Sequence, residues 1–263
     1  MVSTQPQSTA YFPAEAFRLI DGPTLAVRRA PGPLRPIVLI SDLGRDSRDW
    51  AEVAPRLAGA GHEVAAVDLR GHGASEITPS GYDTDTCADD LATLIELLGY
   101  AGGRSPVLAG HGWGANVAMS MAARRDGIAG LACFDGGWLR PAWQYPSAVE
   151  YLAAAESPAQ DDVVMTADKV RSIRTSIFNG EPRAWYPLVR VPVLLAPAVP
   201  ADGEPDPGGV ASVTRTGVGE ASAGLARHRI SWYSGSGHDL PRTRAARVSD
   251  DLLQLATAAE PAA

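Results

Sequence analysis

The chain has 263 residues, of which 45% are hydrophobic and 20% are charged, enough apolar material for the core of one α/β domain with an insertion. The formal net charge of −7, without any run of Lys or Arg, argues against a protein that binds nucleic acid. Membrane-spanning segments need roughly 18–20 consecutive apolar residues, and the sequence has no such stretch.

The first half of the sequence alternates short apolar strands with helices. Residues 17–20 and 24–28 are expected to form a hairpin around Asp21-Gly22-Pro23. The apolar run PIVLIS at 36–41 is typical of a parallel strand that is buried on both faces. Further helices are expected over 50–59, 84–98 and 115–125, and further strands over 62–69, 105–110 and 127–134. This alternation predicts a mostly parallel sheet with helices on both faces.

An aromatic-rich region over residues 139–186 interrupts the alternation. Its pattern is helical, it contains no expected strand, and it follows Trp138. We therefore predict an α/β core of residues 1–138 and 187–263 and a helical lid over 139–186, at the sheet edge where open α/β sheets bind ligands. After the lid we expect a strand at 191–196, a Pro/Gly/Asp-rich loop at 197–209, a strand at 229–233 and a closing helix at 240–256, with loose ends at 1–12 and about 258–263.

Four short segments carry a family resemblance, and it covers nearly the whole chain. They are ISDLG at 40–44, DLRGHGAS at 68–75, GHGWG at 110–114 and GHDLP at 237–241. With these segments the sequence resembles the α/β-hydrolase superfamily, which implies an α/β-hydrolase fold. In that family GHGWG corresponds to the nucleophile elbow, G-x-S-x-G, and GHDLP to the loop that carries the catalytic histidine.

The sequence departs from this family at two positions. Gly112 stands where the resemblance places the nucleophilic serine, and the aspartate of epoxide hydrolases and dehalogenases is absent there too. Asp42 stands where many relatives have a glycine that lets a backbone N–H approach an oxyanion, and its carboxylate would repel that oxyanion. One change affects the nucleophile position and the other affects the oxyanion site. Together they indicate a rebuilt site.

The resemblance brings Asp42, Gly112 and His238 to one pocket floor. We expect Asp42 and His238 to act as a general acid/base pair there, and an apolar, aromatic surrounding would raise the pKa of Asp42. Two structural alternatives stay open, in which Asp42 caps a turn or pairs with Arg45 and His238 is a relic of the family. The acid that supports His238 is also open between Asp135 and the proline-broken loop that holds Asp202.

The remaining site residues are predicted from their position near this floor. Most histidines and Asp68 are expected to be structural: His72 and Asp68 belong to a turn, His62 and His228 lie on the surface, and His111 is structural in most relatives. The residues predicted to contact substrate are Ser41, Leu43, His111, Gly112, Trp113, Trp138, Trp143 and Tyr186.

Three functions are compatible with these residues. The first is a non-hydrolytic enzyme that uses acid/base catalysis for addition, cyclisation, elimination or C–C bond formation on a hydrophobic small molecule. The resemblance implies this role, because members with altered triads occur in bacterial natural-product pathways. The second is a ligand-binding protein that has lost catalysis. The third is a serine hydrolase with an engineered change at Gly112, against which Asp42 argues.

No cofactor, metal ion, nucleic acid or membrane is expected to take part in the function. The sequence has neither HExxH, paired CxxC nor a GxGxxG after a strand. Cys87 and Cys133 lie in no metal or redox spacing, and the N-terminal 13 residues are polar, so we expect buried thiols in a cytoplasmic protein. The oligomeric state cannot be predicted from these features.

Overall fold

The computed structural model describes residues 12–100, 102–154, 165–201, 203–206 and 209–259. Its main sheet has eight strands in the order β1-β2-β4-β3-β5-β6-β7-β9. The predicted opening hairpin is confirmed as an antiparallel pair, β2 is antiparallel to β4, and every later neighbour in the sheet is parallel. The strands are β1 Ala14–Arg18, β2 Thr24–Ala30, β3 Leu34–Ile40, β4 His62–Asp68, β5 Val107–His111, β6 Gly130–Phe134, β7 Val193–Ala196 and β9 His228–Ile230.

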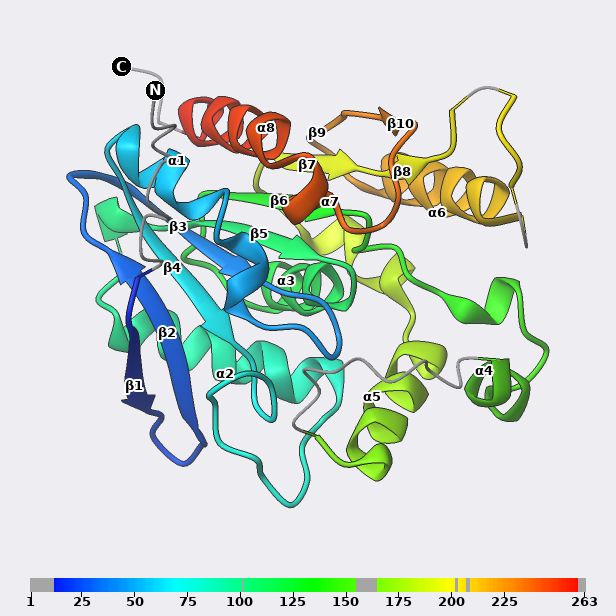
Figure 1. Cartoon of the computed structure of the whole chain (residues 1–263), viewed down its shortest axis with the longest axis horizontal. Helices are drawn as coiled ribbons and strands as arrows, with labels where there is room; N and C mark the ends of the chain where they lie inside the picture. Colours follow the sequence, from blue (N-terminus) through cyan, green and yellow to red (C-terminus); the bar gives the residue numbers. More distant parts are fainter. Residues whose placement is uncertain (1–11, 101, 155–164, 202, 207–208, 260–263) are drawn as a thin grey trace, which may run out of the picture.

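Helices cover both faces of the sheet, as predicted for an α/β-hydrolase fold. In Figure 1 the sheet lies between α1 (Ala54–Gly59) and α8 (Ala245–Ala258) above and α2 (Thr84–Leu97) and α3 (Trp113–Arg124) below. Successive strand residues point to opposite faces. In β3, accordingly, Ile37 and Leu39 pack with α1 and α8, whereas Val38 and Ile40 pack with α2 and α3. Both cores consist of buried apolar side chains, and the strands between them end at one edge of the sheet.

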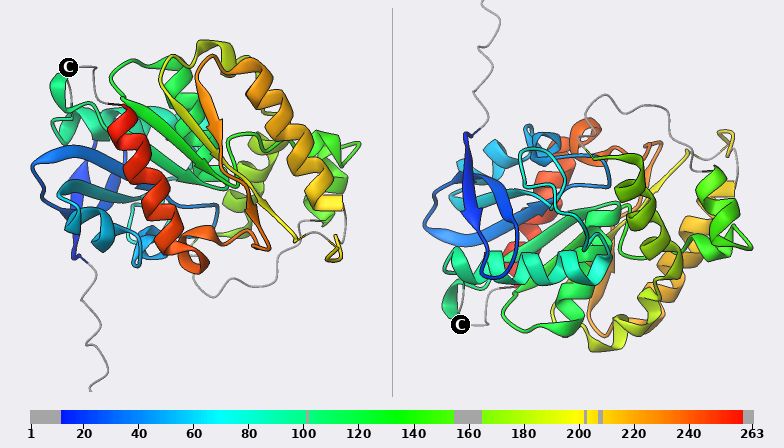
Figure 2. Two further views of the ribbon diagram at one scale, coloured as in Figure 1. Left: turned by 90° about the horizontal axis from the view of Figure 1, so that it is seen from above. Right: turned by 90° about the horizontal axis from the view of Figure 1, so that it is seen from below.

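The segment between β6 and β7 is helical where it is described. It contains α4 (Ala148–Ala154), α5 (Ala167–Asn179) and three short 3₁₀ turns at Pro141–Trp143, Pro182–Ala184 and Tyr186–Leu188. Both views of Figure 2, like Figure 1, place these helices away from the β1–β2 hairpin. None of the helices in the described ranges is both long and apolar enough to cross a bilayer.

One helix was not predicted from the sequence. α6 (Val210–Gly224) follows the Pro/Gly/Asp-rich loop and contains Gly217 and Gly219, two residues that oppose helix formation. Tertiary packing outweighs this local preference, because Gly217 is buried where α6 meets Trp138 and Trp143. The glycine that made the helix hard to predict is therefore required by its packing.

Several predicted boundaries differ from the observed elements. The helix expected over 50–59 is a 3₁₀ turn at Ser47–Trp50 followed by α1, and the closing helix is divided into α7 (Leu240–Thr243) and α8. The expected strand at 229–233 is also divided, because Tyr233–Ser234 (β10) leaves the main sheet and pairs with Ala198–Val199 (β8) in the predicted loop.

His62 was predicted to lie on the surface, but it is buried. It is 8% exposed, and its Nδ1 lies 2.8 Å from the carbonyl oxygen of Arg35. The Cys87 and Cys133 thiols are free and buried, as expected.

Candidate active site

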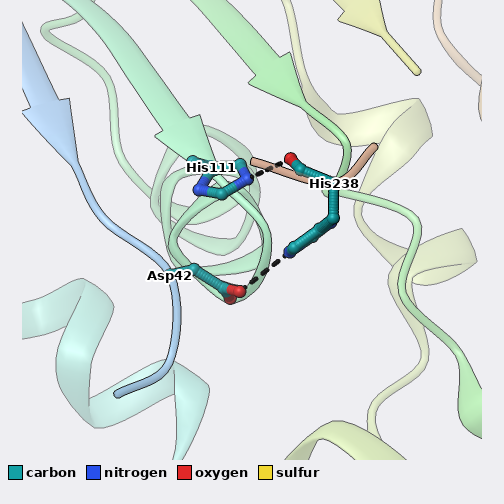
Figure 3. A group of neighbouring side chains, drawn as sticks. All are labelled: Asp42, His111 and His238. Atoms are coloured by element: carbon teal, nitrogen blue, oxygen red, sulfur yellow. Dashed lines mark hydrogen bonds and ion pairs between the residues drawn. The ribbon is translucent and has the colours of Figure 1, made fainter. Parts of the chain in front are cut away.

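Four residues from separate strand ends meet at the carboxyl edge of the sheet. Asp42 follows β3, Gly112 joins β5 to α3, Asp135 follows β6, and His238 lies between β10 and α7. The strands β3, β5 and β6 are neighbours in the sheet, so the residues that follow them lie side by side. Figure 3 shows Asp42 and His238 pointing toward each other, with His111 beside them.

Gly112 has the backbone geometry of a sharp strand-to-helix turn, with φ 52° and ψ −124°. Its N–H donates to the carbonyl of Phe134 over 3.0 Å, which ties the turn to β6. A Cβ atom at Gly112 would lie 2.2 Å from both Cγ and Oδ1 of Asp42. The carboxylate of Asp42 therefore fills the space that a side chain at position 112 would use, and any residue other than glycine would have to displace it.

Two hydrogen bonds hold the Asp42 carboxylate at this point. The backbone N–H of Trp113, the first amide of α3, donates to Oδ1 over 2.6 Å, and His238 Nε2 lies 2.9 Å from Oδ2. Burial alone would raise the pKa of Asp42, but the hydrogen bonds and charge of His238 and the Trp113 N–H together lower it well below its usual range. The predicted raised pKa is therefore wrong: Asp42 is a carboxylate at neutral pH.

His238 lies between two carboxylates. Its Nδ1 is 2.6 Å from Oδ2 of Asp135, on the side opposite Asp42. Burial would lower the pKa of the imidazole, but hydrogen bonds to Asp135 and Asp42 and their charges raise it well above 6.5. With both nitrogens protonated, the imidazole donates one N–H to each carboxylate. Its side chain is 49% exposed at the bottom of an open cavity, so solvent reaches it.

Asp135 is the acid that contacts His238. Its φ of 45° is unusual for a residue other than glycine, and its Oδ1 accepts the N–H of Ala198 over 3.0 Å. This strained backbone is typical of functional sites, and here it aims Oδ2 at His238. Of the two acids left open by the sequence, Asp135 makes this contact and Asp202 lies outside the described residues.

One structural alternative held that Asp42 pairs with Arg45. The Arg45 side chain instead binds two other carboxylates. Its guanidinium donates two hydrogen bonds to Asp49, over 2.6 and 2.8 Å, and one to Asp239 over 3.3 Å. Asp42 accepts from Trp113 and His238 instead.

His111 lies behind His238, outside the cavity lining. Its ring is 4.6 Å from the His238 ring, and its Nε2–H donates to the His238 carbonyl oxygen over 2.8 Å. Burial and the nearby charge of His238 lower the pKa of His111, so it is neutral. The predicted substrate contact is therefore wrong, because His111 is buried and is not among the residues that line the cavity.

A cavity of about 1150 Å³ opens above the Asp42–His238 pair. Among the predicted contacts, Leu43, Trp113, Trp138 and Trp143 line it. Ser41 does not, because its buried hydroxyl donates to the Asp46 carbonyl over 2.6 Å.

Gly112 and Tyr186 are also absent from the lining, in contrast to the prediction. Gly112 is covered by Asp42, whose carboxylate lies over it. Tyr186 is 2% exposed in the core beside Gly224, and its hydroxyl faces the Gly137 carbonyl at 3.5 Å.

Other residues of the lining were not singled out from the sequence. Two are aromatic residues of the insertion, Tyr145 and Tyr151, for which the local aromatic composition was the available signal. The unpredicted helix α6 adds Val210, Val213 and Thr214, and three arginines lie at Arg140, Arg171 and Arg174. Arg140 forms an ion pair with Glu181 over 2.7 Å.

Asp42, His111 and His238 each offer a possible metal-ligand atom, and these atoms lie within 4.8 Å of one another. However, His111 Nε2 donates to a backbone carbonyl, and His238 Nε2 faces Asp42 with a proton. A bound metal ion would have to replace these hydrogen bonds, so the group fits an acid–base pair better than a metal centre.

Comparisons with known proteins agree with this architecture. Residues 37–253 match the model of the alpha/beta hydrolase family. Among curated relatives, a soluble epoxide hydrolase from Corynebacterium sp. is 38% identical over 101 residues, which cover 38% of this chain and 34% of that protein. Epoxide hydrolase A from Mycobacterium tuberculosis is 28% identical over 178 residues, which cover 63% of this chain and 55% of that protein. The matches thus span about a third to a half of these relatives.

Solved structures of this fold cover the chain more completely. An esterase from Thermogutta terrifontis aligns with a TM-score of 0.74 at 20% identity, over 95% of this chain and 100% of that chain. The epoxide hydrolase CorEH aligns with a TM-score of 0.67 at 19% identity, over 94% of this chain and 99% of that chain. At these identities the likeness concerns the fold. The family model covers most of the sequence, and the chain therefore belongs to the alpha/beta hydrolase family.

Proposed function

We propose that the protein is a non-hydrolytic enzyme that uses Asp42 and His238 for acid–base catalysis on a hydrophobic, aromatic small molecule. The observation that carries the proposal is the His238 imidazole held between the carboxylates of Asp42 and Asp135, over 2.9 and 2.6 Å. This arrangement offers a proton donor and a proton acceptor at adjacent atoms without a serine. A role in bacterial natural-product biosynthesis, in which this fold occurs with altered triads, follows as part of the same proposal.

The pKa values of His238 and Asp42 decide which of them donates a proton and which accepts one. His238 is protonated, so its Nε2–H can be given to a substrate oxygen on which negative charge develops. The same transfer frees Oδ2 of Asp42, which then accepts a proton from a carbon or hydroxyl of the substrate. One proton is added and one is removed, which suits addition, elimination and ring closure. Asp135 keeps the imidazole oriented throughout.

The aromatic lining supports an aromatic substrate. Trp113, Trp138 and Trp143 line the cavity together with Tyr145 and Tyr151. Rings stacked on such walls are held by contacts worth roughly 0.5–1.5 kcal/mol per pair beyond the area they bury. Trp143, Tyr145 and Tyr151 belong to residues 139–186, which we propose to be a lid that shields the proton transfers from water.

Hydrogen–deuterium exchange tests the proposal without knowledge of the natural substrate. β-Tetralone is an aromatic ketone with acidic C–H bonds, and NMR in deuterated water follows its exchange. Asp42→Asn and His238→Ala should each slow enzyme-dependent exchange by roughly 10²–10⁴-fold, while affinity measured by tryptophan quenching changes by less than about tenfold. Exchange that both variants retain at the wild-type rate would contradict the proposal, and so would a wild type that binds but never exchanges.

A second candidate is hydrolysis of an epoxide through a covalent ester on Asp42. Two observations favour this candidate. The Asp42 carboxylate occupies the space of a side chain at position 112, and its Oδ1 accepts a hydrogen bond from the Trp113 N–H. Some of the relatives are named epoxide hydrolases. Asp42 would attack a ring carbon as the C–O bond breaks, and His238 would protonate the released oxygen. The neutral imidazole would then deprotonate water, which attacks Cγ and releases the diol. Epoxide plus water gives diol, so the atoms balance.

Heavy-oxygen water distinguishes the two candidates. In a single turnover of styrene oxide, attack of labelled water on Cγ places heavy oxygen in Asp42, which peptide mass spectrometry detects. His238→Gln should accumulate the alkyl ester, seen as an intact-mass increase equal to styrene oxide. Diol formation without label in Asp42, or no diol at all, would exclude the covalent route and leave the acid–base proposal intact.

A further inference from the structure

Arg45 connects the two segments that carry the catalytic pair. It lies in the turn after β3, and its backbone N–H donates to the carbonyl oxygen of Asp42 over 3.1 Å. Its guanidinium donates to Oδ2 and Oδ1 of Asp49 over 2.6 and 2.8 Å, and to Oδ2 of Asp239 over 3.3 Å. Asp239 is the residue after His238. One side chain therefore joins the Asp42 turn to the His238 loop, 194 positions apart in the sequence.

Two other contacts join the same part of the fold: α7 packs against the 3₁₀ turn at Ser47–Trp50, and Asp42 is hydrogen-bonded to His238. Asp42 and His238 are on loops, which are less rigid than the strands that precede them. His111 holds the His238 carbonyl to β5, but it does not touch the Asp42 turn by any hydrogen bond recorded for the described residues. Besides the hydrogen bond between Asp42 and His238 themselves, the Arg45 side chain joins the turn to the loop through Asp239.

The charges around Arg45 fit this role. Asp49 is 8% exposed, and burial together with the nearby charge of Asp239 raises its pKa, while Arg45 opposes that rise. Arg45 in turn has its pKa raised, mainly by the hydrogen bonds to Asp49. Without the guanidinium, the carboxylates of Asp49 and Asp239 would repel each other and move the loop outward. A planar fork can hold two carboxylates at fixed angles, whereas a lysine cannot.

We infer that Arg45 is a positioning residue that holds the Asp42 turn and the His238 loop at the 2.9 Å separation between Asp42 Oδ2 and His238 Nε2. The inference rests on the proposed function for its importance, but the geometry can be tested without a substrate. If the loop moves outward, the Asp42 carboxylate acts less on the imidazole. Besides Asp42, the titratable groups that face His238 are Asp135, on the side opposite Asp42, and neutral His111.

NMR titration of the His238 ring, in protein with labelled histidine, reports how strongly the Asp42 carboxylate acts on the imidazole. Arg45→Gln should lower the His238 midpoint by about one pH unit or more, because the attraction of a nearby opposite charge is weakened. Arg45→Lys should fall between Arg45→Gln and the wild type. The matched control is Arg242→Gln: Arg242 approaches the same Asp239 carboxylate, at 3.8 Å, but from α7, so it does not link the two segments. Its midpoint should equal that of the wild type.

Arg45→Gln leaves Asp49 buried without its partner and can destabilise the fold. The double variant Arg45→Gln with Asp49→Asn removes that buried charge and still breaks the link to Asp239. It should show the same lowered midpoint. A wild-type midpoint in the folded double variant overturns the inference, as does an equal shift in Arg242→Gln. Failure of the β-tetralone exchange assay, by contrast, concerns the proposed function and leaves this result standing.

Discussion

The carboxylate of Asp42 occupies the place of a side chain at Gly112, since a Cβ there would lie 2.2 Å from Asp42 Cγ. The two residues come from different strands, yet each requires the other. A serine at the elbow would displace the carboxylate, and a glycine at position 42 would leave the elbow pocket empty. This close fit supports our proposal that the two departures implied by the family resemblance, at positions 42 and 112, belong to one rebuilt site.

Gly112→Ser should therefore not create a serine hydrolase. The new side chain overlaps the Asp42 carboxylate and sits at φ 52°, so we expect a lower melting temperature, loss of β-tetralone exchange, and no labelling by a fluorophosphonate. Gly99→Ser is the matched control, because Gly99 also has positive φ, 73°, but a Cβ there meets nothing within 4 Å. Its cost measures backbone strain alone, without the overlap.

The double change Gly112→Ser with Asp42→Gly removes the overlap and returns a serine beside His238. If Asp42 is what blocks hydrolysis, this variant alone should hydrolyse p-nitrophenyl esters with an initial burst. Fast ester turnover by the wild type, or by Gly112→Ser without the second change, would show that Asp42 is no obstacle and would contradict the rebuilt site.

Much of this architecture could be predicted because its signals are local. Buried parallel strands appear as apolar runs such as PIVLIS, and the segments around Gly112 and His238 are short and specific. The meeting of Asp42 with His238 followed from the family's topology. The direction of the Asp42 pKa shift did not, because the hydrogen bonds that outweigh burial depend on atomic positions.

Other features depended on contacts distant in sequence. α6 contains glycines that disfavour a helix, and packing against Trp138 explains Gly217 but not Gly219. Tyr186 belongs to an aromatic-rich segment, but its ring packs inward against α6. Asp135 was one of the candidate acids, but its contact with His238 depends on a positive φ that no sequence pattern reveals.

Asp135→Asn should move the alkaline limb of the pH profile to lower pH. His238 donates a proton only while it is protonated, and its raised pKa keeps it so through neutrality, so wild-type activity should fall only at alkaline pH. Removing the charge of Asp135 removes one cause of that rise. The variant should thus lose activity as pH increases through a lower midpoint than in the wild type, measured from the pH dependence of β-tetralone exchange. An unchanged midpoint would show that Asp42 alone determines the pKa.

The same shifts predict how this ion pair contributes to stability. For His238, whose folded pKa is raised, the contribution is complete below pH 6.5 and is lost as pH rises through the folded value. For Asp42, whose folded pKa is lowered, the contribution is present above its ordinary value of 3.8 and is lost as pH falls through the lower folded value. Urea unfolding should therefore show a wild-type excess over Asp42→Asn that shrinks at strongly acidic and at alkaline pH. An excess independent of pH would indicate packing instead.

Trp143→Ala should weaken ligand binding, because the ring lines the cavity. Loss of a stacking aromatic typically costs on the order of one to a few kcal/mol, so the Kd of β-tetralone should rise by roughly ten- to a hundredfold. Trp232→Ala is the control, since Trp232 is exposed and absent from the lining. Tyr186→Phe should be almost neutral, because its hydroxyl makes only a 3.5 Å contact. Equal affinities for all three variants would contradict the proposal that aromatic side chains of the cavity bind the substrate.

Two glycines of α6 provide the final prediction. A Cβ at Gly217 would lie 2.6 Å from Cδ1 of Trp138 and 2.9 Å from Cζ3 of Trp143, whereas a Cβ at Gly219 meets nothing within 4 Å. Alanine favours a helix over glycine by about 1 kcal/mol, so Gly219→Ala should raise the free energy of unfolding by up to that amount. Gly217→Ala receives the same helical gain, but the overlap with two large rings costs about 1–3 kcal/mol.

The outcome for Gly217→Ala should thus be a lower free energy of unfolding in urea than for Gly219→Ala, together with weaker binding of β-tetralone. The binding loss follows because the displaced rings of Trp138 and Trp143 form part of the cavity wall. If the two alanine variants unfold at the same urea concentration and bind equally, α6 does not press on these rings. The contribution of α6 to the cavity would then be limited to its own lining residues, Val210, Val213 and Thr214.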